Sequence, residues 1–206
     1  MTNYHLWPEV SSCLKDIEKE KNKLTKSKVN LDTLTAIRKS ISHHLEQLQL
    51  SFEQELNKHF ASLSIFAIVA YVDEQMQSHV LDLGQGNWAP LQKDFYGAYN
   101  AGELFYETID KIIDDSEVPP IVLEVFYFIM KKGFKGKYRD SKTQIAKYIE
   151  LLKETIPVAE QKNDSTILEK QTPRFKGKIQ AWHYYAGAGV VTLSLLAILY
   201  ITSNLS

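Results

Sequence analysis

Five cations surround two glycines in the stretch LEVFYFIMKKGFKGKYRD, residues 123–140, and residues of these types could cradle a phosphate group or contact a polyanion. A Walker-type loop needs four residues between its glycines and a Ser or Thr after its Lys, because that hydroxyl binds magnesium. Here two residues separate Gly133 from Gly136, and Tyr138 follows Lys137. The spacing predicts a turn that ends a helix, with Gly133 at the helix C-terminus, and no nucleotide site.

The whole chain offers no positive excess for nucleic acid and no pattern for metal or thiol chemistry. Its 24 Lys and Arg residues are balanced by 25 Asp and Glu residues, which gives a formal net charge of −1. We therefore expect no nucleic-acid partner. Cys13 is the single cysteine, and the six histidines are scattered without ligand spacing. We expect no cofactor, no metal, no catalytic residue and no enzymatic activity.

Asp73 and Glu74 are candidate functional residues because of their position in the sequence. They follow a segment, residues 59–72, that has no formally charged side chain and that we expect to be buried. Adjacent helical residues lie about 100° apart, so the two carboxylates cannot grip one substrate as facing catalytic carboxylates do. Two interpretations stay open: an ordinary helix surface, or an acidic groove that binds a protein partner through Asp73 and Glu74.

The elements that would carry these residues are helices. Prolines are few and fall between periodic segments. An apolar face repeats at helical spacing from Leu31 to Phe52, with Asn30 placed to cap its N-terminus. A short helix before it is predicted by Leu6, Val10, Leu14 and Ile17, followed by a charged connector. Further helical patterns cover residues 57–83 and about 90–98, 102–114, 119–132 and 141–155.

The C-terminal segment predicts a membrane span. From Ile179 to the last residue there is no Lys, Arg, Asp or Glu, and about 20 apolar helical residues suffice to cross a bilayer. Arg174, Lys176 and Lys178 precede this segment and predict a cytoplasmic N-terminal side. The predicted fold class is therefore all-α: a cytoplasmic bundle of about six or seven helices with one C-terminal transmembrane helix.

Four stretches in a fixed order resemble the DotU/TssL family of bacterial type VI and type IVB secretion systems. They are YVDE at 71–74, Trp88 followed by Pro90-Leu91, AGELFY at 101–106, and LEVFYFIMKKGFKGKYR at 123–139. The resemblance covers about residues 31–152. Lys131 and Lys132 stand where the family usually keeps apolar residues, and Tyr106 replaces a Phe. The matching positions, to which the resemblance gives structural roles, are Trp88, Gly102, Glu103, Phe105, Leu123, Glu124, Tyr127, Gly133, Phe134, Gly136, Tyr138 and Arg139.

The resemblance implies a structural role in a secretion apparatus. Proteins of this kind are tail-anchored, single-pass proteins of the bacterial inner membrane with a cytoplasmic N-terminal domain and a periplasmic C-terminus. The implied partners are an IcmF/TssM-like inner-membrane protein, baseplate subunits and the membrane lipid around the C-terminal helix, with a second copy of the chain as a further candidate. Type VI is the favoured apparatus. A type IVB DotU subunit and a tail-anchored adaptor unrelated to secretion remain as alternatives.

These expectations divide the chain into five segments. Residues 1–29 form the N-terminal short helix and charged connector, and residues 30–156 the DotU/TssL-like helical domain. A linker at 157–178, the anchor at 179–202 and a short periplasmic tail at 203–206 complete the chain.

Overall fold

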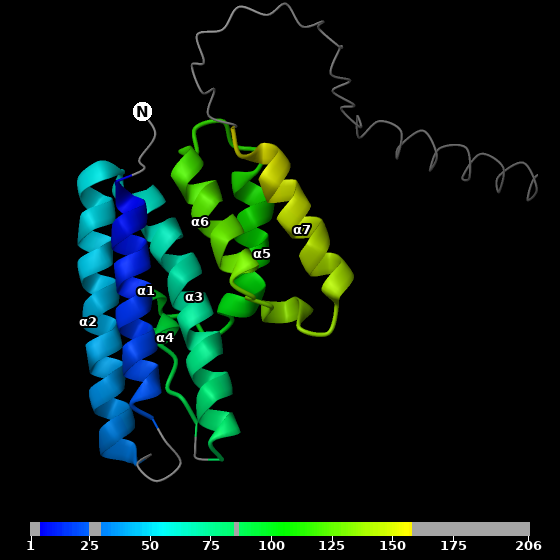
Figure 1. Cartoon of the computed structure of the whole chain (residues 1–206). Coiled ribbons are helices and arrows are strands. Elements are labelled where there is room, and N and C mark those ends of the chain that lie inside the picture. Colours follow the sequence, from blue (N-terminus) through cyan, green and yellow to red (C-terminus); the bar gives the residue numbers. More distant parts are fainter. Residues whose placement is uncertain (1–4, 25–29, 85–86, 158–206) are drawn as a thin grey trace, which may run out of the picture. The chain divides into compact units, whose positions relative to one another are not determined.

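The computed structural model describes residues 5–24, 30–84 and 87–157, and within these ranges the chain forms seven α-helices, one short 3-10 helix and no strand. The prediction of an all-helical bundle of six or seven helices is confirmed for this part of the chain (Figure 1). The helices are α1 Leu6–Asn22, α2 Leu31–Glu55, α3 Lys58–Asp82, α4 Gln92–Tyr96, α5 Ala101–Ile112, α6 Pro120–Lys131, η1 Gly136–Tyr138 and α7 Lys142–Thr155.

The first three helices lie side by side along their lengths and alternate in direction (Figure 1). The apolar face predicted for α2 is buried from Ile37 to Phe52, through Ile37, Ile41, Leu45, Leu48 and Phe52. In the first turn it is not: Leu34 is half-buried and Leu31 is 79% exposed. Asn30 caps this helix as expected, because its side-chain oxygen accepts a hydrogen bond from the backbone N–H of Thr33 at 2.7 Å.

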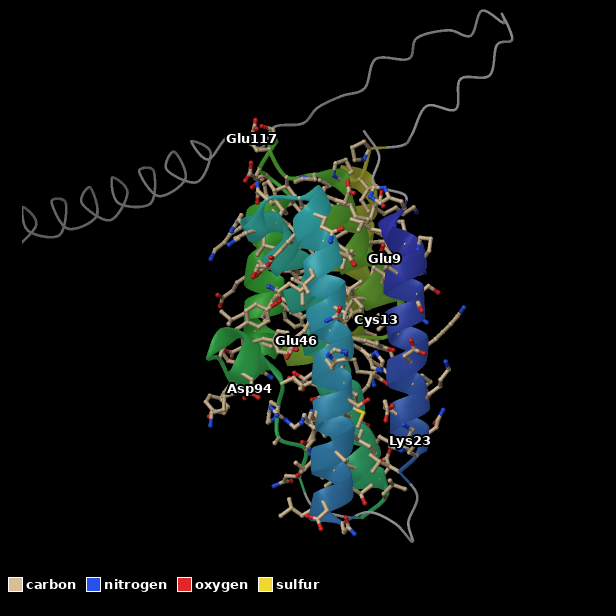
Figure 2. The ribbon with its side chains drawn as sticks, turned by 90° about the vertical axis from the view of Figure 1, so that its left-hand side faces the viewer. Glu9, Cys13, Lys23, Glu46, Asp94 and Glu117 are labelled. Carbon is tan, nitrogen blue, oxygen red and sulfur yellow. The ribbon has the colours of Figure 1, made fainter. Side chains whose placement is uncertain are left out.

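Helix α1 is longer than the sequence pattern predicted. It continues through the first charged residues of the expected connector and ends at Asn22, with ion pairs Lys21–Glu18 at 2.7 Å and Lys23–Glu20 at 2.6 Å. Ion pairs between residues three apart stabilise a solvated helix. The helix therefore continues into the charged segment, where the sequence pattern predicted a connector. Figure 2 shows Glu9 and Lys23 near opposite ends of α1, which runs beside α2.

Helix α3 is the centre of the bundle, as its charge-free segment predicted. It packs against α1, α2, α4, α5 and α6, and its residues from Ile65 to Ala70 are all buried. A helix that is apolar on all faces is stable only when it is buried on all faces, and the surrounding helices bury α3 in this way.

The helix before the predicted turn ends as expected. Pro120 stands in the first turn of α6, and Gly133 adopts a φ of +100° just after its C-terminus. The N–H of Gly133 donates to the carbonyl of Met130 at 3.0 Å and the N–H of Phe134 to that of Ile129 at 3.3 Å, which is the Schellman pattern.

The predicted anchor at 179–202 and tail at 203–206 lie outside the described residues, as does the linker apart from Pro157. Among the helices of residues 5–157 that the structure describes, none combines the length and the apolar character needed to span a bilayer.

Candidate functional site

The four stretches that carry the family resemblance meet around one cavity of about 240 Å³. It lies where α3, the segment before α4, the start of α5 and the turn after α6 come together. The lining residues are Ala70, Asp73, Glu74, Gln77, Trp88, Pro90, Gln92, Ala101, Gly102, Phe134, Gly136 and Arg139. We call this place the motif cavity.

Asp73 lies inside the bundle and holds the segment before α4 in place. Its side chain is 5% exposed, and it accepts hydrogen bonds from the indole Nε1 of Trp88 at 2.8 Å and from the backbone N–H groups of Leu91 at 2.8 Å and Gln92 at 2.9 Å. Burial raises the pKa of Asp73, while these three donors act in the opposite direction. An ordinary helix surface therefore does not fit Asp73, because its carboxylate is buried and bonded within the fold; that Asp73 serves a partner site stays a prediction.

Glu74 points to a different element and holds the turn after α6. Its carboxylate oxygens accept the backbone N–H of Lys135 at 3.0 Å and that of Gly136 at 2.8 Å. These donors precede and open η1, so the carboxylate caps that short helix from another helix. Glu74 is half-buried, whereas Asp73 is buried, and the expected acidic pair is thus divided between two structural contacts.

Two glutamines extend this network, and sequence reasoning missed both. The side-chain Oε1 of Gln92 accepts the backbone N–H of Ala101 at 2.7 Å, which fixes the start of α5. The Oε1 of Gln77 accepts the backbone N–H of Trp88 at 3.2 Å. Gln92 directly follows the Pro90-Leu91 motif, but a glutamine in a helical pattern normally indicates a solvated face, so its burial could not be predicted from the pattern.

Gly102 and Gly136 allow two backbones to touch at the cavity. A Cβ built on Gly136 would lie 2.7 Å from the carbonyl oxygen of Gly102, and one built on Gly102 would lie 3.3 Å from the Cα of Gly136. Gly136 also has a φ of +49°, which side chains rarely adopt. Gly136 therefore requires glycine for this close approach, whereas a Cβ on Gly102 would make a tight contact that a small shift of the turn could relieve.

Aromatic rings anchor the turn from the other side. The ring of Phe134 packs against Phe105 with centroids 4.3 Å apart, and Tyr106 contacts Tyr138 edge-on at 4.6 Å. The hydroxyl of Tyr106 donates to the carbonyl of Lys135 at 2.9 Å, so Tyr in place of the family's Phe adds a hydrogen bond to the turn. Burial is the main cause that raises the pKa of Tyr106.

Apart from Arg139, the other motif residues are not gathered at the cavity. Leu123 is buried in the core, Tyr127 packs against the core from α6, and Glu103 is exposed in the first turn of α5. Glu124 accepts a hydrogen bond from the indole Nε1 of Trp7 at 3.0 Å, which ties α6 to α1. Arg139 is exposed and lines the cavity. The motif therefore combines core, tether and surface positions.

The arrangement acts as a brace for surface segments. Asp73 orients the approach to α4, Glu74 orients the turn at η1, and Gln92 orients α5. A general base or nucleophile needs an acceptor aimed at a reacting group, whereas both carboxylates here accept N–H groups of the fold: backbone N–H groups in each case and, for Asp73, also the Trp88 indole. Among the lining residues, the half-buried Glu74 and the exposed Arg139 carry charges of opposite sign, and we call these two residues the rim of the motif cavity.

Comparison with known proteins identifies the fold and the family. Solved structures that resemble the chain include "3D Structure of DotU from Francisella novicida", with a TM-score of 0.60 and 22% identity, which covers 72% of this chain and 97% of its own. "Cytoplasmic domain of TssL from Acinetobacter baumannii" has a TM-score of 0.54 and 20% identity, and covers 73% of this chain and 98% of its own. At these identities the likeness establishes the fold. No curated protein sequence gave a match.

The family model described as "Type VI secretion system protein DotU" matches residues 19–205. This match includes every stretch on which the sequence resemblance depended, and it extends beyond them toward both ends. The chain therefore belongs to the DotU family of type VI secretion system proteins.

Proposed function

We propose that the chain is a structural component of a type VI secretion membrane complex, in which the helical bundle is the cytoplasmic adaptor and residues 179–202 are the inner-membrane anchor. In this role it links an IcmF/TssM-like inner-membrane protein to the baseplate. The observation that carries the proposal is the family match over residues 19–205, which includes both the described bundle and the charge-free C-terminal segment.

The location of the bundle is supported by one solved relative. That structure is titled as the cytoplasmic domain of TssL, and it covers 73% of this chain, a share that fits the bundle without the C-terminal segment. The basic residues before the predicted span support the same orientation, because positive flanks favour the cytoplasmic side.

The contact surface that we assign to a secretion partner is the rim of the motif cavity. Glu74 and the exposed Arg139 supply charges of both signs there. Asp73 takes part indirectly, because it fixes the segment that forms one wall of the cavity. The acidic pair then serves partner recognition by positioning the surface, with Glu74 closer to the partner than Asp73.

The proposal is tested by isolating the tagged full chain from its own bacterium in detergent and identifying an IcmF/TssM-like protein by mass spectrometry. We expect this protein to co-purify with the intact chain and to be lost from a variant that lacks residues 179–202. A matched variant in which the span is replaced by an unrelated single-pass helix separates specific contact from mere membrane attachment.

Three results would count against the proposal. A periplasmic N-terminus in reporter fusions would reverse the orientation. Co-purification with type IVB components instead would assign the chain to that apparatus, and recovery of the chain without any IcmF-like protein would leave only a tail-anchored adaptor.

A further inference from the structure

A second cavity of about 270 Å³ lies between α1, α3 and α6. On α3 the motif cavity is lined by Ala70, Asp73, Glu74 and Gln77, and the second cavity by Tyr71, Val72, Gln75 and Met76. Because successive helical residues turn by about 100°, these two sets point to opposite sides of α3. The second cavity, which we call the α1 groove, is therefore separate from the motif cavity.

The α1 groove has an apolar floor and apolar walls. Ile17, Val72 and Met76 form a buried floor, and the walls include the half-buried Leu14 and Phe128. Methionine is flexible enough to fit side chains of different shapes. Covering the walls with another apolar group would remove apolar surface from water, which favours binding.

Cations predominate around this apolar surface. Lys15, Lys21 and Lys132 line the groove together with one acid, Glu18. Glu18 is paired with Lys21 at 2.7 Å. Lys15 and Lys132 are exposed, and neither forms an ion pair with any residue that the structure describes. The Nζ atom of Lys132 lies 5.5 Å from the ring centroid of Phe128, at the apolar wall itself.

We propose that the α1 groove docks a short acidic amphipathic segment of a partner protein. Its apolar side chains enter the groove between α1 and α6, and its carboxylates face Lys15 and Lys132. This is the mode of recognition in which an amphipathic helix lies in a hydrophobic groove, and apolar side chains about one turn apart on that helix anchor it there. The volume of about 270 Å³ is below the roughly 300–1,000 Å³ of small-molecule pockets, so one or two anchoring side chains fit it better than a cofactor.

The rim charges set the specificity of this site. Opposite charges around an apolar contact steer association and exclude partners of the same sign. A basic or uncharged amphipathic segment would meet the same floor but would leave Lys15 and Lys132 without counter-charges. The groove therefore distinguishes its ligand by charge as well as by apolar fit.

The test uses the detergent-solubilised full chain and a fluorescein-labelled peptide that carries leucines on one helical face and glutamates elsewhere, followed by fluorescence anisotropy. We expect saturable binding that the double variant K15E/K132E weakens roughly tenfold, because two attractive contacts become repulsive. The weakening should shrink as salt is raised. The matched control is K58E/K147E, which makes the same charge change at two exposed lysines that do not line the groove.

A second variant tests the apolar part of the site without a change of charge. Gln75 is half-buried and lines the groove from α3, so Gln75→Trp should fill the groove and weaken peptide binding while the helical circular dichroism is retained. This variant also decides the matter if K15E/K132E fails to fold. The peptide with serine in place of leucine should bind much more weakly.

Four outcomes would overturn the proposal. The first is the absence of saturable binding, and the second is equal affinity for the serine peptide or for a peptide with lysine in place of glutamate. Equal or tighter binding of a peptide of residues 158–173, which places Ile167 and Leu168 between Asp164 and Glu169, would make the chain's own linker the occupant. The fourth is that K15E/K132E reduces binding to phosphatidylglycerol vesicles, or self-association, and leaves peptide binding unchanged.

Discussion

The carboxylate of Asp73 shows how one residue can join segments that are distant in the sequence. Its hydrogen-bond donors come from Trp88, Leu91 and Gln92, which are 15 to 19 residues further along the chain. In the sequence, Asp73 follows the charge-free segment 59–72, and both open interpretations place it at the surface. The helical period places a side chain on a face, but it does not reveal which later segment covers that face. The burial of Asp73 was therefore outside the reach of sequence reasoning.

Replacement of this carboxylate should be costly. Asp73→Ala leaves three buried donors without an acceptor, and we expect the free energy of unfolding to fall by about 3 kcal/mol. Urea unfolding of the detergent-solubilised chain, followed by circular dichroism, measures the change. Asp114→Ala, at an exposed position, is the control and should change stability by less than about 0.5 kcal/mol. A loss in Asp73→Ala no larger than that in the control would show that water replaces the carboxylate.

The raised pKa of Asp73 predicts a pH dependence with a definite sign. A carboxyl whose pKa is higher in the folded state than the unfolded value of 3.8 binds its proton more tightly when folded. Its contribution is then largest below that unfolded value and is lost as pH rises through the folded pKa. We expect the stability advantage of the native chain over Asp73→Asn to shrink as pH is raised from about 4. An advantage that grows with pH would mean that the three donors outweigh burial and lower the pKa.

The turn between α6 and α7 shows what holds an element in place. The sequence predicted the helix end at Gly133, because glycine at that position and a preceding apolar period are local signals. It did not predict that Glu74, 61 residues earlier than Lys135, caps η1, or that Gly102 and Gly136 touch. These contacts depend on the packing of α3 and α5 against the turn, which no local pattern contains. Local signals therefore predicted the elements, and long-range contacts decided how the motif residues come together.

A comparison of two glycines separates close contact from backbone conformation. Gly136 and Gly97 both have positive φ, but a Cβ on Gly97 meets nothing within 4 Å, whereas one on Gly136 meets a carbonyl oxygen at 2.7 Å. Gly97→Ala should cost about 1 kcal/mol of stability from its conformation alone. Gly136→Ala should cost about 2 kcal/mol more, because the turn must move away from α5. Equal shifts of the urea midpoint for the two variants would show that the turn yields without cost.

At the scale of the whole bundle, α1 is an integral part and not an appendage. The family model begins at residue 19, and the sequence pattern placed a short helix and a connector before the domain. In the structure, Leu6, Val10, Cys13 and Ile17 belong to the one buried cluster that runs through the other helices. Trp7 also donates to Glu124 and packs edge-on against Phe128 at 5.2 Å, so α1 is bound to α6 as well as to α2.

Substitution of one α1 residue should therefore destabilise the entire bundle. Val10 is fully buried and Ser12 is exposed on the same helix. Val10→Asp buries a charge, and we expect the single unfolding transition to lose at least about 3 kcal/mol, whereas Ser12→Asp should be near neutral. Tryptophan fluorescence and circular dichroism should report coincident transitions. A separate early transition in Val10→Asp, with the main one unchanged, would show that α1 folds independently of the rest.

The buried thiol of Cys13 is a built-in probe for local opening of the contact between α1 and α2. The Sγ atom donates to the carbonyl of His44 at 3.6 Å between α1 and α2, and burial raises the pKa of the thiol to about 12. The Cys13 thiolate is the form that attacks a maleimide or Ellman reagent, so the closed bundle should be nearly inert at neutral pH. Because this is the single cysteine of the sequence, the rate of any slow labelling reports how often the α1–α2 contact opens. Fluorophores can accordingly be attached at a newly introduced surface cysteine while the native sequence is otherwise kept.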